Sequence, residues 1–299
     1  MSCGFFVLIF FHSIRSKTMK KLITIMMIAA VAVSGLFAKS AKSKKILAVA
    51  SSEHTLTLLD GKTTMETGFY LNEFAVPAMY VAERGYEIVL ATPKGNRPEM
   101  DKGSNSARFF GGDEAMREAA EKFVSELNVI SLKDAISGGL EQYAGILVPG
   151  GHAPLIDLVD NAEMGEILTY FHKANKPTAF ICHGPAAILS SVPNASEFKA
   201  AIVARDFRKA NQIAGKDWIY YGYKMTGFTS AEEKGGEVRN GTEMPVHITD
   251  AMQIAGGIVE LGHMGESHVV RDRELITGQN PASDIALAEA FYRALQGKK

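Results

Sequence analysis

Residues 178–185 read TAFICHGP, a short apolar run that meets a cysteine, a histidine, a glycine and a proline. Such a run, bounded by Gly and Pro, is typical of a buried strand, and proline is favoured in the first turn of a helix. We therefore predict a strand over 178–181, a sharp turn at Cys182 and a helix from Pro185. A tight strand-to-helix turn exposes its side chain above the carboxyl edge of a sheet, as in a nucleophile elbow.

Strands and helices alternate along the chain on both sides of that turn. Apolar runs predict further strands over 45–50, 86–91 and 143–148, and a hairpin at 268–270 and 275–277. Helical patterns cover 71–84, 113–127, 162–174, 248–259 and 284–295. Residues 96–112 and 194–245 have the weakest patterns, and we expect them to be insertions over one end of the sheet. The alternation predicts an α/β fold, a three-layer sandwich with a mostly parallel central sheet.

The composition excludes several classes of protein. Of 299 residues, 46% are hydrophobic and 22% are charged, and the formal net charge is −1. This excludes a disordered chain and provides no basic field for nucleic acid. Two cysteines cannot form a disulfide framework. The sequence has neither a P-loop nor a dinucleotide-binding glycine pattern after a strand, so no nucleotide cofactor is expected.

The N-terminal segment differs from the rest of the chain. Met19 and two lysines precede an uncharged apolar run over 22–38 that ends in Ala38. A basic start, an apolar stretch and a small terminal residue are typical of a secretory signal peptide. We expect 1–18 to be an upstream extension, with Met19 the true start. A short basic linker at 39–44 would then precede a single domain over 45–297. The run has 17 residues, the lower limit for a bilayer span, so a membrane anchor is the alternative.

Export would change the charge and the cysteine content of the mature protein. Removal of residues 1–38 leaves 28 basic and 33 acidic residues, a net charge of −5, and removes Cys3. Cys182 is then the single thiol of a periplasmic or secreted protein. Negative charge is favoured at the start of the following helix, so we expect a lowered thiol pKa and a reactive cysteine. A buried structural cysteine is the alternative.

Two other segments carry residues that could act with Cys182. Residues 148–152 read VPGGH after a predicted strand, where the Gly151 N–H could donate to an oxyanion. An ordinary strand-to-helix turn is the alternative there. Glu73 lies near the start of a predicted helix. It either complements the helix dipole or faces Cys182 and moves protons.

Together these segments resemble the ThiJ/PfpI superfamily over residues 45–297. The resemblance rests on Glu73 with Pro77 and on the stretches PGGH at 149–152, CHGP at 182–185, TGFT at 226–229 and TGQNPAS at 277–283. It implies the flavodoxin-like fold of class I glutamine amidotransferases. It also points to the branch of heat-shock chaperones and glutathione-independent glyoxalases (glyoxalase III). Ala153 departs from this branch, which often has a glycine at that position.

The resemblance implies a role for each residue of the site. Cys182 would be the nucleophile, with Glu73 as a hydrogen-bonded proton shuttle. His183 would be the general base, oriented by Glu233, with Glu232 and Asp206 as weaker candidates for that acid. The residues expected to bind substrate or an oxyanion are Gly150, Gly151, His152 and Gly184, together with the N–H of His183.

The implied reaction converts methylglyoxal or glyoxal to lactate or glycolate through a hemithioacetal on Cys182, without metal or glutathione. Deglycation of protein adducts is a related possibility. We expect a homodimer that binds neither nucleic acid nor, after signal cleavage, membranes. The alternatives are a stress-related holdase chaperone that binds unfolded proteins, a redox-sensing protein, and a cysteine amidohydrolase or peptidase. No histidine pair has a strong zinc-binding spacing, so no metal site is expected.

The leader gives the first testable prediction. Expressed in a bacterium with its own N-terminus, the protein should be recovered from the periplasm or the medium with Lys39 as its first residue, because the apolar run ends at Ala38. N-terminal sequencing and intact mass measure this. Recovery in the membrane fraction with residues 19–38 retained would instead support the anchor.

Overall fold

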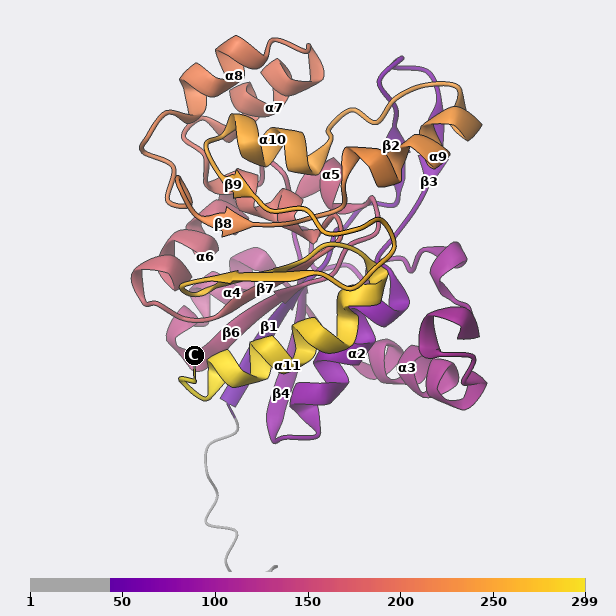
Figure 1. Ribbon diagram of the computed structural model, residues 1–299. Helices are drawn as coiled ribbons and strands as arrows, with labels where there is room; N and C mark the ends of the chain where they lie inside the picture. The colour runs from indigo at the N-terminus through magenta and orange to yellow at the C-terminus, as the bar shows by residue number, and fades with distance from the viewer. Residues whose placement is uncertain (1–43, 299) are drawn as a thin grey trace, which may run out of the picture. The chain divides into compact units, whose positions relative to one another are not determined.

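A seven-stranded sheet runs through the middle of the molecule in the order β10-β11-β7-β6-β1-β4-β5 (Figure 1). All neighbours pair in parallel except β10 and β11, which form the predicted hairpin. The strands are β1 Lys44–Val49, β4 Tyr86–Thr92, β5 Val129–Ser131, β6 Tyr143–Val148, β7 Thr178–Ile181, β10 Val269–Asp272 and β11 Leu275–Gly278. The predicted α/β sandwich with a mostly parallel sheet is confirmed.

This computed structural model describes residues 44–298. The predicted extension, signal peptide and most of the basic linker therefore lie outside the described residues. Lys44, assigned to the linker from the sequence, is the first residue of β1. Among the described residues, no helix combines the length and the apolar character that a bilayer span requires.

Helices cover both faces of the sheet, which explains why its strands are apolar throughout. One face carries α2 Leu71–Ala82, α3 Glu114–Glu126 and α11 Asp284–Leu295, and α2 and α11 lie side by side (Figure 1). The other face carries α4 Leu132–Ser137, α5 Pro154–Asp157, α6 Ala162–Lys173 and the 3₁₀ helix η4 Gly184–Ser191. The helix predicted from Pro185 is thus a 3₁₀ helix that begins one residue earlier.

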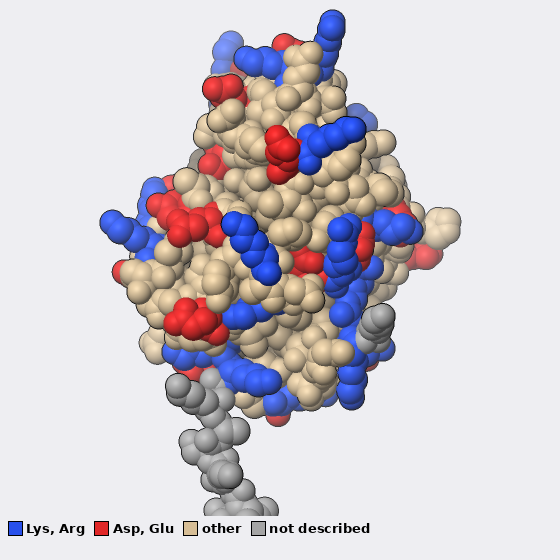
Figure 2. Space-filling model, turned by 90° about the vertical axis from the view of Figure 1, so that its left-hand side faces the viewer, with Lys and Arg blue, Asp and Glu red and all other residues tan. Residues whose placement is uncertain are grey.

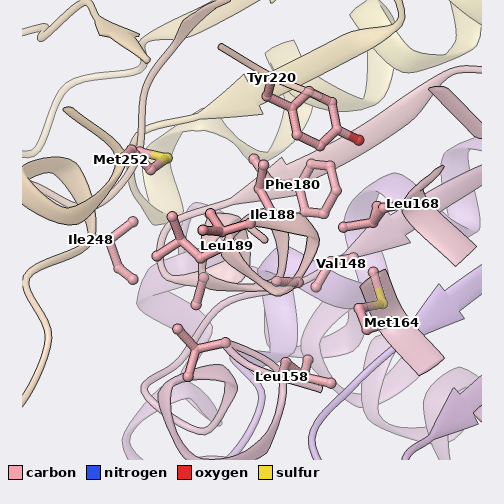
Figure 3. Close-up of a cluster of buried hydrophobic side chains, with 14 of the residues drawn as sticks. Val148, Leu158, Met164, Leu168, Phe180, Ile188, Leu189, Tyr220, Ile248 and Met252 are labelled. Carbon is pink, nitrogen blue, oxygen red and sulfur yellow. The ribbon is translucent and has the colours of Figure 1, made fainter. Parts of the chain in front are cut away.

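The core on the α6 side connects the sheet to the C-terminal third of the chain. Phe180 from β7 and Leu189 from η4 pack in one buried cluster with Tyr220 and with Ile248 and Met252 of a later helix (Figure 3). All these side chains are at most 1% exposed. The C-terminal third is therefore fixed to the strand that precedes Cys182.

The interval 194–245 has weak sequence patterns but forms regular structure. It contains α7 Ala195–Val203, α8 Phe207–Ala214, α9 Ser230–Asn240 and the short strand β8 Lys224–Met225. Side chains cap two of these helices: Asp206 accepts from Lys209 N (3.0 Å), and Thr229 forms a capping box with Glu232. Helix α9 is mostly polar and contains two glycines, so local capping and tertiary contacts, rather than an apolar stripe, account for it.

The helix predicted over 248–259 was too long. Helix α10 Ile248–Ile254 ends before Gly256, whose φ of +103° stops a right-handed helix, and β9 Ile258–Val259 then pairs with β8. The sequence patterns missed β5, α4 and a two-stranded ribbon, β2 Thr55–Thr57 and β3 Thr64–Glu66. These elements have three to six residues, too few to show a period.

The core predicts a large effect of truncation. Phe171 on α6 is fully buried, so Phe171→Ala should lower the free energy of unfolding by about 3–5 kcal/mol. Ile285→Ala is the matched control, because Ile285 is 61% exposed, and it should change stability by less than about 1 kcal/mol. Urea denaturation of both variants measures the difference. Equal losses would contradict this account of the core.

Candidate active site

The turn after β7 places Cys182 in a backbone conformation that is unusual for any residue except glycine. Its φ is +61°, in the left-handed region. Two hydrogen bonds hold it there: Cys182 N donates to Gly278 O of β11 (2.9 Å), and Phe228 N donates to Cys182 O (2.8 Å). A non-glycine residue in this region costs roughly 1–2 kcal/mol, and such strain concentrates at functional sites.

Glu73 reaches the elbow from the first turn of α2. Its side chain is fully buried, and Oε2 accepts the N–H of Gly150 at 3.0 Å. Oε1 has no oxygen or nitrogen partner among the described residues, and the same carboxyl group lies within hydrogen-bond reach of the Cys182 thiol. Burial raises the pKa of Glu73 to about 8, so at neutral pH the group is a carboxylic acid with a proton to donate.

Cys182 itself is not activated by its surroundings in the resting site. Burial, together with the neighbouring Glu73 carboxyl, raises its pKa well above the ordinary value, although the Gly151 N–H acts in the opposite direction. The expectation that the helix N-terminus would lower this pKa is therefore wrong. Removal of the thiolate from water outweighs the favourable dipole. The cysteine rests as a thiol and needs a base.

His183 can act as that base. Its Nδ1 lies 3.4 Å from Cys182 Sγ, and its Nε2 contacts Glu233 Oε1. Burial lowers the pKa of His183, so the ring is neutral at neutral pH. With the Nε2 proton donated to Glu233, the Nδ1 lone pair faces the thiol.

Glu233 accepts hydrogen bonds from two histidines. Its second oxygen, Oε2, lies 3.2 Å from His152 Nε2, and the His152 and His183 ring centroids are 4.1 Å apart. Burial raises the pKa of Glu233. The two histidines lower this pKa by a larger amount, so it lies far below its usual range. The carboxylate therefore remains ionised in a buried position.

The two weaker acid candidates lie elsewhere. Glu232 faces the opposite side of α9, where it accepts from Thr229, Gly265 N and Asn280. Asp206 caps α8. Neither contacts His183 among the described hydrogen bonds, and the structure brings Glu233 alone of the three beside it.

The predicted glycines allow the backbone to approach the cysteine. A Cβ at Gly150 would lie 2.6 Å from both Cys182 Cβ and Glu73 Oε2. Gly151 has a φ of +79°, and its N–H points to the thiol sulfur. Gly184 instead lies against β6, where a Cβ would meet Val148 O at 2.4 Å. Ala153 starts α5 with a φ of −55°, so no glycine is required there.

A cavity of about 420 Å³ lies near this cluster, but neither Cys182, His183, Glu73 nor Glu233 lines it, and the sequence alone did not identify its walls. Phe228 connects the two, because its ring lies 4.7 Å from that of His183 and also lines the cavity. Further walls come from Arg108 and Phe109 in the weakly patterned interval 96–112 and from Asn72, next to Glu73. The TGFT stretch contained Phe228, but nothing in its spacing indicated contact with His183.

The family model described as ThiJ/PfpI family-like matches residues 64–236, which include all the residues of this cluster. The chain belongs to the ThiJ/PfpI family. This ThiJ/PfpI chain is 25% identical over 260 residues to the protein/nucleic acid deglycase HchA of Pseudomonas aeruginosa, covering 84% of this chain and 81% of that protein. A similar relative is glutamine amidotransferase-like class 1 domain-containing protein 1 of Bos taurus, 24% identical over 206 residues, with coverage of 69% and 79%.

Solved structures share the fold of this ThiJ/PfpI protein. Rapid Encystment Protein 24 kDa of Francisella tularensis matches with a TM-score of 0.63 at 23% identity, covering 84% of this chain and 99% of that one. Glyoxalase III of Candida albicans matches with a TM-score of 0.57 at 21% identity, covering 84% and 96%. At these identities the likeness establishes the fold.

The raised pKa of Glu73 predicts a pH-dependent stability. The folded state keeps a proton on Glu73 up to about pH 8, whereas the unfolded chain releases it near pH 4.5, so stability falls between these values. The lowered pKa values of Glu233 and His183 change the stability only below pH 4.5 and pH 6.5 respectively, which are the ordinary pKa values of the two groups. Between pH 6.5 and 8, Glu73 contributes a slope of about 1.4 kcal/mol per pH unit, and the raised pKa of His247 acts in the same direction.

Glu73→Gln removes this titration and keeps the shape of the side chain. Relative to the unmodified protein, it should gain about 2 kcal/mol of stability between pH 6.5 and 8, measured by urea denaturation at both values. Glu87→Gln, at an exposed position on β4, is the control. If the stability curves of Glu73→Gln and the unmodified protein run parallel, Glu73 does not carry the proton.

Proposed function

We propose that this protein is a cofactor-independent glyoxalase or deglycase that acts on reactive carbonyl compounds through Cys182. The observation that carries the proposal is the placement of one thiol between a neutral imidazole and a protonated carboxyl group. This pair can remove a proton at one carbon and supply one at the next. The deglycase activity in the name of HchA, a relative that covers most of the chain, supports the same class of reaction.

The first step would form a bond between sulfur and the aldehyde carbon of methylglyoxal or glyoxal. His183 Nδ1 takes the thiol proton while sulfur attacks, and the imidazolium then returns this proton to the aldehyde oxygen, which gives a hemithioacetal and neutral His183. Glu233 stabilises the imidazolium that forms for a moment. The N–H groups of Gly151 and His183 lie at the elbow, where they can donate to the developing oxyanion.

The second step would move a proton from C1 to C2. Neutral His183 removes the C1 proton of the hemithioacetal, the electron pair forms an enediolate with the neighbouring carbonyl, and the C1 hydroxyl proton passes to the C2 oxygen. The Glu73 acid, buried beside the sulfur, is placed to return a proton at C2. The product is a thioester of lactate or glycolate on Cys182. Water then attacks the thioester carbonyl and releases the hydroxy acid and the free thiol.

The size of the cavity favours an additional class of substrate. The cavity of about 420 Å³ begins at Phe228 and is not lined by Cys182, so a small dicarbonyl bound at the thiol would leave it free. A carbonyl adduct still attached to an amino-acid side chain or a nucleobase would use more of it.

The name of HchA covers protein and nucleic acid substrates alike, so nucleotide adducts belong in the test even though the sequence shows no basic field. Acidic and basic side chains are scattered among other residues on the face shown in Figure 2.

Export and dimerisation complete the proposal. The leader would place this chemistry outside the cytoplasm, where a single thiol is exposed to oxidants. A homodimer is expected from the family.

The test is turnover of methylglyoxal without glutathione, measured as lactate formation, next to glycated N-acetyl-lysine and glycated guanosine. Cys182→Ala and Glu73→Gln should abolish turnover. Glu233→Gln should lower kcat/KM by roughly 10²-fold or more, because His183 loses its orienting carboxylate. Asp206→Asn is the control and should retain full activity, because Asp206 caps α8.

Two results would contradict the proposal. The first is no turnover of any carbonyl compound by protein whose Cys182 reacts with a thiol probe. The second is equal activity of Cys182→Ala and the unmodified protein. The first result would favour the amidohydrolase or the holdase chaperone instead, and the second would show that the reaction does not use Cys182.

A further inference from the structure

Within residues 44–298, His152, His183 and Glu233 form the one group of three or more potential metal ligands that lie close together. Their ligand atoms lie within 4.8 Å of one another. We infer that this cluster binds a divalent transition-metal ion of the Zn²⁺ type, and that the bound ion reversibly blocks the base of the active site. Metal binding goes beyond the proposed function and does not depend on it. Only the inhibition rests on the proposed role of His183.

The distances suit a tetrahedral ion. Zn²⁺ holds nitrogen and oxygen ligands at about 2.0–2.2 Å, which separates neighbouring ligand atoms by roughly 3.4 Å. Glu233 Oε2 and His152 Nε2 are already 3.2 Å apart, and Glu233 Oε1 contacts His183 Nε2. Small rotations of the two rings, whose centroids are 4.1 Å apart, would open space for the ion.

The chemistry of the ligands also suits the metal. Two imidazoles and one carboxylate form the zinc set of several hydrolases, in which the fourth position is left for water or substrate. The His152 side chain is 21% exposed, whereas those of His183 and Glu233 are at most 4% exposed, so an ion can enter along His152.

The bound ion would reverse the direction of the His183 hydrogen bonds. A metal on Nε2 requires the proton of the neutral ring to move to Nδ1. The Nδ1–H then donates to Cys182 Sγ, 3.4 Å away, and cannot accept the thiol proton. Zn²⁺ thus competes with the catalytic proton transfer without touching the sulfur. Removal of the ion restores the base.

The alternative binding site for Zn²⁺ is the Cys182 thiol. Thiolate is a preferred zinc ligand, and Cys182 with His183 Nδ1 offers two ligand atoms on the other edge of the ring. Cys182→Ser distinguishes a zinc site at the thiol from the inferred site, because it removes the sulfur and leaves all three residues of the inferred site.

The experiment is a titration of metal-free Cys182→Ser protein with Zn²⁺ by calorimetry, and with Co²⁺ by visible absorption. We expect one ion per chain and the absorption of tetrahedral Co²⁺ without a sulfur-to-metal charge-transfer band. In the same background, His152→Gln should weaken Zn²⁺ binding by roughly 100-fold or more, since even second-shell losses cost 10–100-fold. His172→Gln is the matched control, since His172 pairs with Glu274 at 2.7 Å without a third ligand.

Glu233→Gln provides a second test if His152→Gln does not fold, and it should weaken binding to a similar degree. In the unmodified protein, Zn²⁺ should inhibit turnover and EDTA should restore it. Loss of Zn²⁺ binding in Cys182→Ser, or binding that neither His152→Gln nor Glu233→Gln weakens, overturns the inference. Because Zn²⁺ binding is measured in a variant without the nucleophile, the test of the metal site is independent of the test of the proposed reaction.

Discussion

The left-handed backbone of Cys182 is the constraint on which the site depends. The conformation is unfavourable for a cysteine, and hydrogen bonds to Gly278 and Phe228 hold it from two distant segments. Those segments are themselves fixed by the sheet and by the core that joins η4 to the C-terminal third (Figure 3). The position of the thiol is therefore determined by packing across the whole fold.

Burial sets the charge state of every group around the thiol. Removal from water raises the pKa of Glu73 and Cys182 and lowers that of His183, so all three are neutral at rest. Glu233 alone is ionised, because two histidines direct their ring nitrogens at its oxygens. The site thus holds one fixed negative charge and a set of neutral groups that exchange protons.

Helix α9 shows how a polar segment contributes to this arrangement. It carries two neighbouring glutamates. Glu232 accepts hydrogen bonds from Gly265 N and Asn280 near the cavity, and Glu233 contacts His183. Its amino-acid pattern lacks an apolar stripe, so the periodicity of the sequence did not indicate a helix there. The Thr229–Glu232 capping box is the local signal that marks its start.

The sequence alone determined the alternation of strands and helices, the parallel sheet and the turn at Cys182, because apolar runs and Gly-Pro punctuation act over a few neighbouring residues. It offered Glu73 as one of two alternatives from its place in a helix, and it indicated His183 and Glu233 only through a family resemblance. The tertiary structure decided the raised pKa of Cys182, the shared use of Glu233 by His152 and His183, and the walls of the cavity. These properties depend on desolvation and on contacts between residues up to 212 positions apart, such as Asn72 and Asp284 in the cavity wall, which no local pattern encodes.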